Sequence, residues 1–473
     1  MKRRWTALFA LFIALAAARL CHIRILWPDG DYHLAAARQI VQGAVIYRDF
    51  WFDKPPLDPL LHVLFGARAG APLMLASAAY LWLACLAAYF LARRLWSEPE
   101  GLLAAGLLCL HLIFYLPSAV IPLPVDAAML VPHLAAVGAA AAGWPLVAGV
   151  AAAIAFLFNV KGLFVLAVCL FWLSDRWRRT LAGFVSVCVL AAVALAAAGA
   201  LSGYIDQVWR WGIVYAGSSP ETHPYLNGAA RTANWLGFHA AIALGTLCFF
   251  WKEHDGMRRR AAVWLAISAA AVAIGLRFAP RYFFQWLPVM VLLGARGLRL
   301  AYKQRPRLIA ATACLLLLVP VVRFGPRYFL LAADLAAGRR HAWDDIRLDQ
   351  DSRQAAELIR RQARPSETLL VWGYRPAIFV YTGLKAGSPF LDSQPLTGVP
   401  AERHFYVSNP VDSRLARANR AELSRCNPTF IVDALGFANP NLAIHRFADL
   451  KPWLDNYQLF AQTQLSRIYR RKP

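Results

Sequence analysis

Long apolar runs separated by short polar breaks dominate roughly the first two thirds of this chain. Each run approaches the roughly 20 apolar residues with which an α-helix crosses a bilayer core. Because a backbone in lipid must satisfy its own hydrogen bonds, such runs predict a polytopic helical membrane protein. The runs lie at 5–26, 71–91, 102–116, 125–142, 181–201, 237–251, 261–276 and 308–322.

Two further apolar stretches contain a polar break, and each break changes the predicted topology. Residues 145–173 are interrupted around Asn159 and Lys161, and residues 261–296 between Arg277 and Arg281, where Pro280 cannot continue a helix. We interpret each stretch as two short helices that meet at an outward-facing turn. The count is then about eleven spans, and the polar turns favour a water-accessible cavity.

Composition and charge support the same class. The chain is 59% hydrophobic and 16% charged, whereas a soluble domain carries about a quarter charged residues. The net charge of +23 does not indicate a nucleic-acid partner, because the basic residues gather in alternate loops, the positive-inside pattern. This pattern predicts a cytoplasmic N-terminus and an outward-facing loop after the first run. The first run resembles a signal sequence but lacks a small-residue cleavage site before Trp27-Pro28, so we interpret it as a retained span. The basic loops are 2–4, 93–94, 176–179, 252–260 and 296–307.

From about residue 340 the composition becomes that of a soluble domain. Strand patterns alternate with helix patterns, which predicts a small α/β domain on the outer face. We therefore divide the chain into a membrane domain (1–322) whose first outer loop is 27–70, a connecting segment (323–339) and an extracytoplasmic domain (340–473). The expected helices are 352–364, 414–426 and one near 446–455, and the expected strands are 368–373, 429–433 and 457–463.

The first outer loop carries an unusual set of polar residues next to the membrane. Asp29 and Asp31 flank Gly30, and residues 32–43 read as a short helix along the membrane that ends at Gly43. An Asp-Gly-Asp triplet also suits a turn or a helix cap. A carboxylate at the boundary of apolar and aqueous phases is partly desolvated, which suits a general base that acts on an acceptor hydroxyl. The triplet alone does not say which aspartate is the base.

Four cations at outward-facing positions are candidates for binding an anionic leaving group. Lys54 precedes Pro55-Pro56, Lys161 lies in one polar break, and Arg277 and Arg281 flank the other. Several converging cations would stabilise a departing phosphate. The alternatives are nonspecific contact with lipid headgroups for Lys54 and snorkelling for Arg281. Intramembrane cations are costly, which makes Lys161 and Arg277 functional candidates.

Three other features have a structural and a functional interpretation. Asp126 opens a span at the outer face, either as a helix cap or as a second active-site acid. The aromatic-rich segment 202–236 is either an interfacial belt or a lid over a lipid site. The eight cysteines lie mostly in apolar runs and show no metal-ligand spacing, so we interpret them as small buried hydrophobes and expect no metal site.

At this point the residues resemble a known family. Asp29 before an Ala-Ala-Ala-Arg helix, Gly43, Tyr47-Arg48-Asp49-Phe50 and Lys54-Pro55-Pro56-Leu57 are similar to the first outer loop of GT-C glycosyltransferases. The nearest groups are bacterial Rgt-like membrane glycosyltransferases, with aminoarabinose transferases and protein O-mannosyltransferases further away. The resemblance covers roughly residues 1–300. Weaker matches are Asp126, Lys161, and Arg281-Tyr282 with Pro288.

The resemblance implies a specific activity. Members transfer a sugar from a polyprenyl-phosphate donor to a lipid, glycan or protein acceptor at the outer membrane face, generally without a metal or other cofactor. By position Asp29 would be the acid–base residue and Lys54 would hold the donor phosphate. The second acid of the family's pair is here Gly30, a departure that Asp31 would have to compensate. The implied location is the bacterial inner membrane, and membrane lipids are further partners.

Three other activities fit parts of the same pattern. A transporter or flippase of lipid-linked sugars would share the spans and the cations but would not need an acidic base outside the bilayer. A polymerase or ligase of surface polysaccharide would use a similar substrate with a pyrophosphate leaving group. A noncatalytic membrane scaffold would depend on none of Asp29, Asp31 and Lys54.

Overall fold

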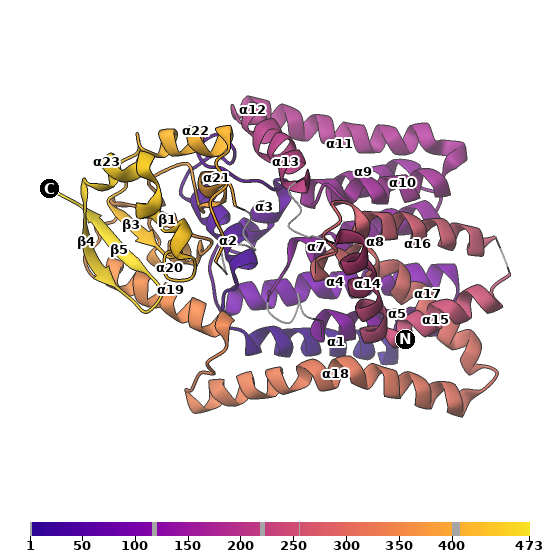
Figure 1. Cartoon of the computed structure of the whole chain (residues 1–473). Helices are drawn as coiled ribbons and strands as arrows, with labels where there is room; N and C mark the ends of the chain where they lie inside the picture. Colours follow the sequence, from indigo (N-terminus) through magenta and orange to yellow (C-terminus); the bar gives the residue numbers. More distant parts are fainter. Residues whose placement is uncertain (1, 116–120, 218–222, 255, 400–406) are drawn as a thin grey trace.

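The computed structural model consists of a bundle of apolar helices beside an α/β domain, with the first outer loop between them (Figure 1). It describes residues 2–115, 121–217, 223–254, 256–399 and 407–473. The last residue of the apolar run 102–116 and residues 218–222 of the aromatic-rich segment lie outside this described part. Within it, the expected fold class, a polytopic helical membrane protein with a C-terminal α/β domain, is confirmed.

The N-terminal part is entirely helical apart from its connections. A helix occupies every range that the apolar runs and the two broken stretches predict. The elements are α1 (Lys2–Cys21), α2 (Pro28–Val41), α3 (Leu57–Leu64), α4 (Ala71–Leu95), α5 (Glu98–Ile113), α7 (Val125–Ala128), α8 (Leu130–Ala141), α9 (Pro145–Phe158), α10 (Gly162–Trp172), η1 (Ser174–Arg176), α11 (Trp177–Ala197), α12 (Leu201–Tyr204), the π-helix η2 (Ile205–Arg210), α13 (Trp211–Gly217), α14 (Pro224–Phe238), α15 (Ala240–Lys252), α16 (Met257–Ala273), η3 (Pro280–Gln285), α17 (Leu287–Tyr302) and α18 (Pro306–Ala337).

The lengths of these helices separate complete spans from shorter ones. Within the described residues, four helical segments are long and apolar enough to cross a membrane, namely Arg3–Cys21, Ala71–Leu95, Ser174–Ala197 and Pro306–Ala337. A fifth candidate is the pair α14 and α15, which is bent by 91° at His239. Shorter apolar helices pack among them, including α9 and α10, which meet at the predicted polar break.

Two regions differ from the sequence-based expectation in their local structure. Much of the segment 202–236, expected to be an outer loop, is helical, with α12, η2, α13 and α14 in its described part. Helix α18 continues through two internal prolines to Ala337, across the range expected to connect the domains. Gly338 then ends this helix in the left-handed conformation, at a φ of 67°, which glycine adopts without strain.

The C-terminal domain contains a five-stranded sheet with strand order β2-β1-β3-β5-β4. Strand β1 runs parallel to β2 and β3, whereas β5 is antiparallel to β3 and β4. The sequence pattern predicted β1, β3 and β4 but missed the short edge strand β2 and the charged β5. The elements are α19 (Asp344–Arg360), β1 (Thr368–Trp372), α20 (Ala377–Thr382), β2 (Lys385–Ala386), α21 (Gln394–Thr397), α22 (Arg414–Leu423), β3 (Phe430–Asp433), η5 (Pro440–Leu442), η6 (Ile444–Arg446), η7 (Ala448–Leu450), α23 (Lys451–Leu454), β4 (Tyr457–Gln462) and β5 (Arg467–Arg471).

The C-terminal domain and the first outer loop share a hydrophobic core. Tyr32, Phe50 and Phe52 of the loop belong to the same buried cluster as Leu369 of β1 and Phe379 of α20. Burial of such aromatic side chains is worth roughly 2–3 kcal/mol each. The loop is therefore held rigidly between the bundle and the domain, which fixes the polar residues that it carries.

Candidate active site

Helix α2 places the two aspartates of the loop on different faces. Both lie in its first turn, where carboxylates interact favourably with the helix dipole. Residues two positions apart on an α-helix point about 200° apart. Gly43, with a φ of 96°, follows the helix, as the sequence predicted. The helical geometry therefore gives Asp29 and Asp31 different partners.

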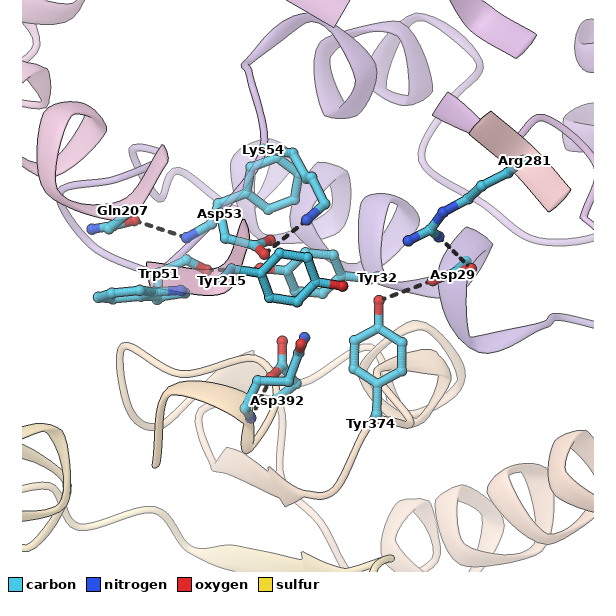
Figure 2. A network of polar contacts seen from close by, with 12 residues as sticks. Asp29, Tyr32, Trp51, Asp53, Lys54, Gln207, Tyr215, Arg281, Tyr374 and Asp392 are labelled. Carbon is cyan, nitrogen blue, oxygen red and sulfur yellow. Dashed lines mark hydrogen bonds and ion pairs between the residues drawn. The ribbon is translucent and has the colours of Figure 1, made fainter. Parts of the chain in front are cut away.

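Asp29 interacts with both the bundle and the C-terminal domain. One carboxylate oxygen accepts a hydrogen bond from Nη1 of Arg281 at 2.6 Å, and the other accepts one from the Tyr374 hydroxyl at 3.3 Å (Figure 2). About a third of its side chain (32%) is exposed. Burial alone would raise the pKa of Asp29, but the charge and hydrogen bond of Arg281 outweigh it and keep this pKa below its usual value. Asp29 is thus an ionised carboxylate that substrate can reach.

Asp31 is enclosed, with 1% of its surface exposed. Its Oδ2 accepts a hydrogen bond from the backbone N–H of Ala377 at 2.7 Å, at the first residue of α20. Burial, reinforced by the charge of Asp29, raises the pKa of Asp31 well above its usual value. A carboxyl group in this position holds the C-terminal domain against the loop and is closed to substrate.

Lys54 belongs to the same network of polar residues as Asp29 (Figure 2). Its Nζ is 2.8 Å from Oδ2 of the buried Asp53 and 5.6 Å from the ring centroid of Tyr215. The ammonium also acts electrostatically on Asp29, and 31% of its side chain is exposed. Its backbone carbonyl accepts a hydrogen bond from the Tyr47 hydroxyl at 2.6 Å, which fixes the segment before the two prolines.

The turns between the short helices bring further predicted residues to this side of the bundle. The carboxylate of Asp126 accepts a hydrogen bond from the Asn159 amide at 2.9 Å and interacts electrostatically with Lys161 and Arg281. The Lys161 ammonium lies 3.3 Å from the ring centroid of Tyr282. It is buried without a hydrogen-bond partner among the described residues. A buried cation in this state favours an anion, because unpaired burial is costly.

Arg277 lies close to the same group of residues. Its guanidinium stacks on the ring of Tyr215, 3.9 Å from the centroid, and its Nη2 donates to the Tyr215 carbonyl at 2.8 Å. Tyr215 therefore contacts both Arg277 and Lys54. The structure thus brings together six of the seven residues proposed from the sequence, whereas Asp31 lies on the other face of α2. The six are Asp29, Lys54, Asp126, Lys161, Arg277 and Arg281.

Sequence reasoning missed the residues that the C-terminal domain contributes. Tyr374 and Asp392 point from this domain toward the loop (Figure 2). Asp392 is buried, and burial together with the charge of Asp53 raises its pKa to about 7. Burial likewise raises the pKa of Tyr374, so this phenol stays neutral and donates to Asp29. Tyr374 lies two residues after the buried strand β1, and a polar residue in that position is a local signal that could have pointed to it. Asp392 follows the short edge strand β2 and carries no such signal.

A buried cluster of one carboxylate and two imidazoles links α2 to α3. His33, one turn after Asp29, lies with Nδ1 2.8 Å from Oδ2 of Asp58, which is fully buried, and Nδ1 of His62 is 3.4 Å from the same oxygen. Burial alone would raise the pKa of Asp58, but the two histidines together lower it. His33 also acts electrostatically on Asp29. These residues position the helix that carries Asp29.

Within the part of the chain that the structure describes, no group of three or more His, Cys, Asp or Glu side chains is arranged to hold a metal ion. The cations around Asp29 and Asp126 instead favour an anionic ligand. Phosphate is the anion that several convergent Arg and Lys side chains bind best.

Several solved structures share the fold of this chain. No family profile and no curated protein sequence matches the chain. ArnT from Cupriavidus metallidurans bound to undecaprenyl phosphate superposes with a TM-score of 0.55 at 15% identity, covering 98% of this chain and 96% of ArnT. The Archaeoglobus fulgidus oligosaccharyltransferase complex with Zn and sulfate gives 0.54 at 14%, covering 98% and 73%. The same enzyme, AglB, with an inhibitory peptide and a dolichol-phosphate gives 0.52 at 13%, covering 100% and 74%.

These similarities extend over the whole chain, including the C-terminal domain. The expected GT-C fold is therefore confirmed, because the chain shares the architecture of ArnT and of the oligosaccharyltransferase. At this level of identity the similarity defines the fold alone.

Proposed function

We propose that this protein is a membrane glycosyltransferase that transfers a sugar from a polyprenyl-phosphate donor to an acceptor hydroxyl. The observation that carries the proposal is the environment of Asp29, a partly exposed carboxylate held ionised by Arg281 among several cations. Two of the structural neighbours bind undecaprenyl phosphate and a dolichol-phosphate, which supports the class of donor. The lipid, glycan or protein nature of the acceptor remains open within this proposal.

The mechanism that these residues support is a single displacement with inversion. Asp29 removes the proton from the acceptor hydroxyl as the oxygen attacks the anomeric carbon. The bond to the phosphate breaks at the same time, and Lys54, with Lys161 and Arg281, stabilises the departing anion. Asp126, through Asn159, holds the turn that carries Lys161.

Orientation in the membrane follows from the charge pattern. We place the N-terminus in the cytoplasm and the site and the C-terminal domain at the outer face of a bacterial inner membrane, because the basic loops alternate. The polyprenyl chain would lie along the apolar helices of the bundle. The C-terminal domain would complete the site with Tyr374, which contacts Asp29.

The test supplies membranes containing the full-length protein with radiolabelled polyprenyl-phosphate sugars. We expect the wild type to consume a donor and release polyprenyl phosphate, and we expect the reaction to persist in a chelator. Asp29→Asn should eliminate consumption without lowering the amount of folded protein. A flippase would instead move labelled donor across sealed vesicles without cleaving it, and this outcome would contradict the proposal.

A further inference from the structure

A second cluster of cations lines a separate pocket beside α2. The pocket has a volume of about 300 Å³ and lies where the end of α1, the start of α4 and the C-terminal domain meet. Arg38 of α2, Arg68 of the loop before α4 and Arg353 of α19 line it, and no carboxylate does so among the residues that the structure describes. Three arginines from distant parts of the sequence thus line one pocket.

The three arginines differ in their pairing. Arg353 donates to Asp349 at 2.7 Å and to the Tyr381 hydroxyl at 2.8 Å, and its guanidinium stacks on that ring. Arg38 and Arg68 make no ion pair or hydrogen bond with any described side chain or carbonyl, and Nε of Arg38 is buried without a partner. Arg38 is half-buried and Arg68 is exposed, and two guanidinium groups without a carboxylate partner on one pocket favour an anion.

The position of the pocket indicates where that anion comes from. Ile23, directly after α1, and Gly70, directly before α4, both line it, and both helices are candidate membrane spans. The pocket therefore opens at the level where two spans leave the bilayer, the level of lipid headgroups. Arginine binds phosphate oxygens through a fork of parallel N–H groups, which a lysine cannot do.

The pocket is distinct from the site around Asp29. Arg38 follows Asp29 by nine residues on the same helix, which corresponds to about 14 Å along the axis and to the opposite face. On that face α2 packs against the end of α20, where a Cβ at Gly383 would come within 3.2 Å of Nη2 of Arg38. The side chain of Asp31 lies on this same face and is bonded to the start of α20.

From these observations we propose that the pocket binds the phosphate group of a membrane lipid, separately from any sugar donor. Arg38 and Arg68 bind the phosphate oxygens, and Arg353, held by Asp349 and Tyr381, supplies the third positive charge. A lipid bound here bridges α2, the loop before α4 and the C-terminal domain. It therefore stabilises the contact between the two domains. The proposal concerns binding and does not depend on glycosyl transfer.

The experiment measures thermal unfolding of the purified full-length protein after exchange into a non-ionic detergent. Three additives are titrated: a phosphatidic acid, a diacylglycerol with the same acyl chains, and inorganic phosphate. We expect only phosphatidic acid to raise the unfolding temperature, because a ligand that binds the folded state stabilises it. An equal response to diacylglycerol, or no response to phosphatidic acid, would contradict a phosphate site. An equal response to inorganic phosphate would contradict a lipid as the source.

Substitutions then test whether the stabilisation by phosphatidic acid arises at this pocket. Arg38→Gln and Arg68→Gln should each weaken the apparent affinity for phosphatidic acid about tenfold. Arg68 is exposed, so its replacement tests the pocket even if Arg38→Gln lowers the yield of folded protein. Arg361→Gln is the matched control, because this arginine directly after α19 is exposed and paired with Glu357 outside the pocket. A loss of the response in Arg281→Gln instead would assign the phosphate to the site around Asp29 and overturn the proposal.

Discussion

The two faces of helix α2 carry similar side chains in opposite physical states. On one face Asp29 is partly exposed, paired with Arg281 and ionised. On the other face Asp31 is buried, bonded to the backbone of α20, and its pKa is raised. The difference arises because Asp29 lies beside cations of the bundle, whereas Asp31 is enclosed against α20 of the C-terminal domain. Only Asp29 is left partly exposed, which supports it over Asp31 as the proposed base, and Asp31 contacts the C-terminal domain.

The strongest test of this contrast replaces each aspartate by its amide. Asp29→Asn should reduce transfer about 1,000-fold, because a general base contributes two to four orders of magnitude. Asp31→Asn, measured per amount of folded protein, should stay within a few-fold of the wild type. The measurement is the rate of radiolabelled donor consumption in membranes. Comparable losses in both variants would remove the distinction between the two faces.

A second test addresses the cations on the Asp29 face. Lys54→Gln should lower the transfer rate about 100-fold, because a positioned charge on a leaving group is worth roughly two to three orders of magnitude. The control is Arg48→Gln in the same loop, an exposed arginine paired with Asp49. This control should stay near the wild-type rate, and an equal loss would indicate that the loop as a whole had been disturbed.

A third test addresses the structural role of the face of α2 that carries Asp31. Asp31→Ala leaves the N–H of Ala377 buried without an acceptor, which should cost about 2 kcal/mol of stability. Thermal unfolding of the purified protein should show a lowered midpoint, whereas Asp29→Ala should not. An unchanged midpoint for Asp31→Ala would mean that this contact contributes nothing to the association of the domains.

The pH dependence of transfer distinguishes the two carboxyl groups further. The pKa of Asp29 is held below its usual value, so the ionised base should persist, and activity should be retained, as the pH falls toward 4. Arg281→Gln removes the positive charge that favours the ionised form, which raises this pKa. The acidic limb of the rate profile should then move up by about one pH unit. A shift in the opposite direction would exclude Asp29 as the titrating base.

The smallest expected effect is at the contact that the C-terminal domain makes with the base. Tyr374→Phe removes one long hydrogen bond, 3.3 Å, from a neutral phenol to the ionised Asp29. This bond is worth about 1 kcal/mol, so transfer should slow about fivefold. The ring remains, so the midpoint of thermal unfolding should stay the same. A loss as large as that of Asp29→Asn would instead give the phenol a direct part in proton transfer.

Much of the architecture was predictable from local pattern. The apolar runs defined the helices, and the polar breaks at 159–162 and 277–282 defined the turns. These signals are local, because the length of an apolar run and the position of a proline act within one segment. Strands β2 and β5 were missed because one has two residues and the other is rich in arginine. Such strands form because neighbouring strands offer hydrogen bonds, which no local pattern records.

The sequence by itself predicted a polytopic membrane protein, the loop that carries the two aspartates, and seven candidate site residues, of which the structure brings six together. It did so because membrane spans and basic loops obey strong local rules. Only the tertiary structure separated the partly exposed Asp29 from the buried Asp31, and only it brought Tyr374, Asp392 and the arginine pocket into place. Burial and the partners of a charge depend on segments hundreds of residues apart, as the 345 positions between Asp29 and Tyr374 illustrate. The pKa of a carboxyl group is set by those partners and not by its neighbours in the chain.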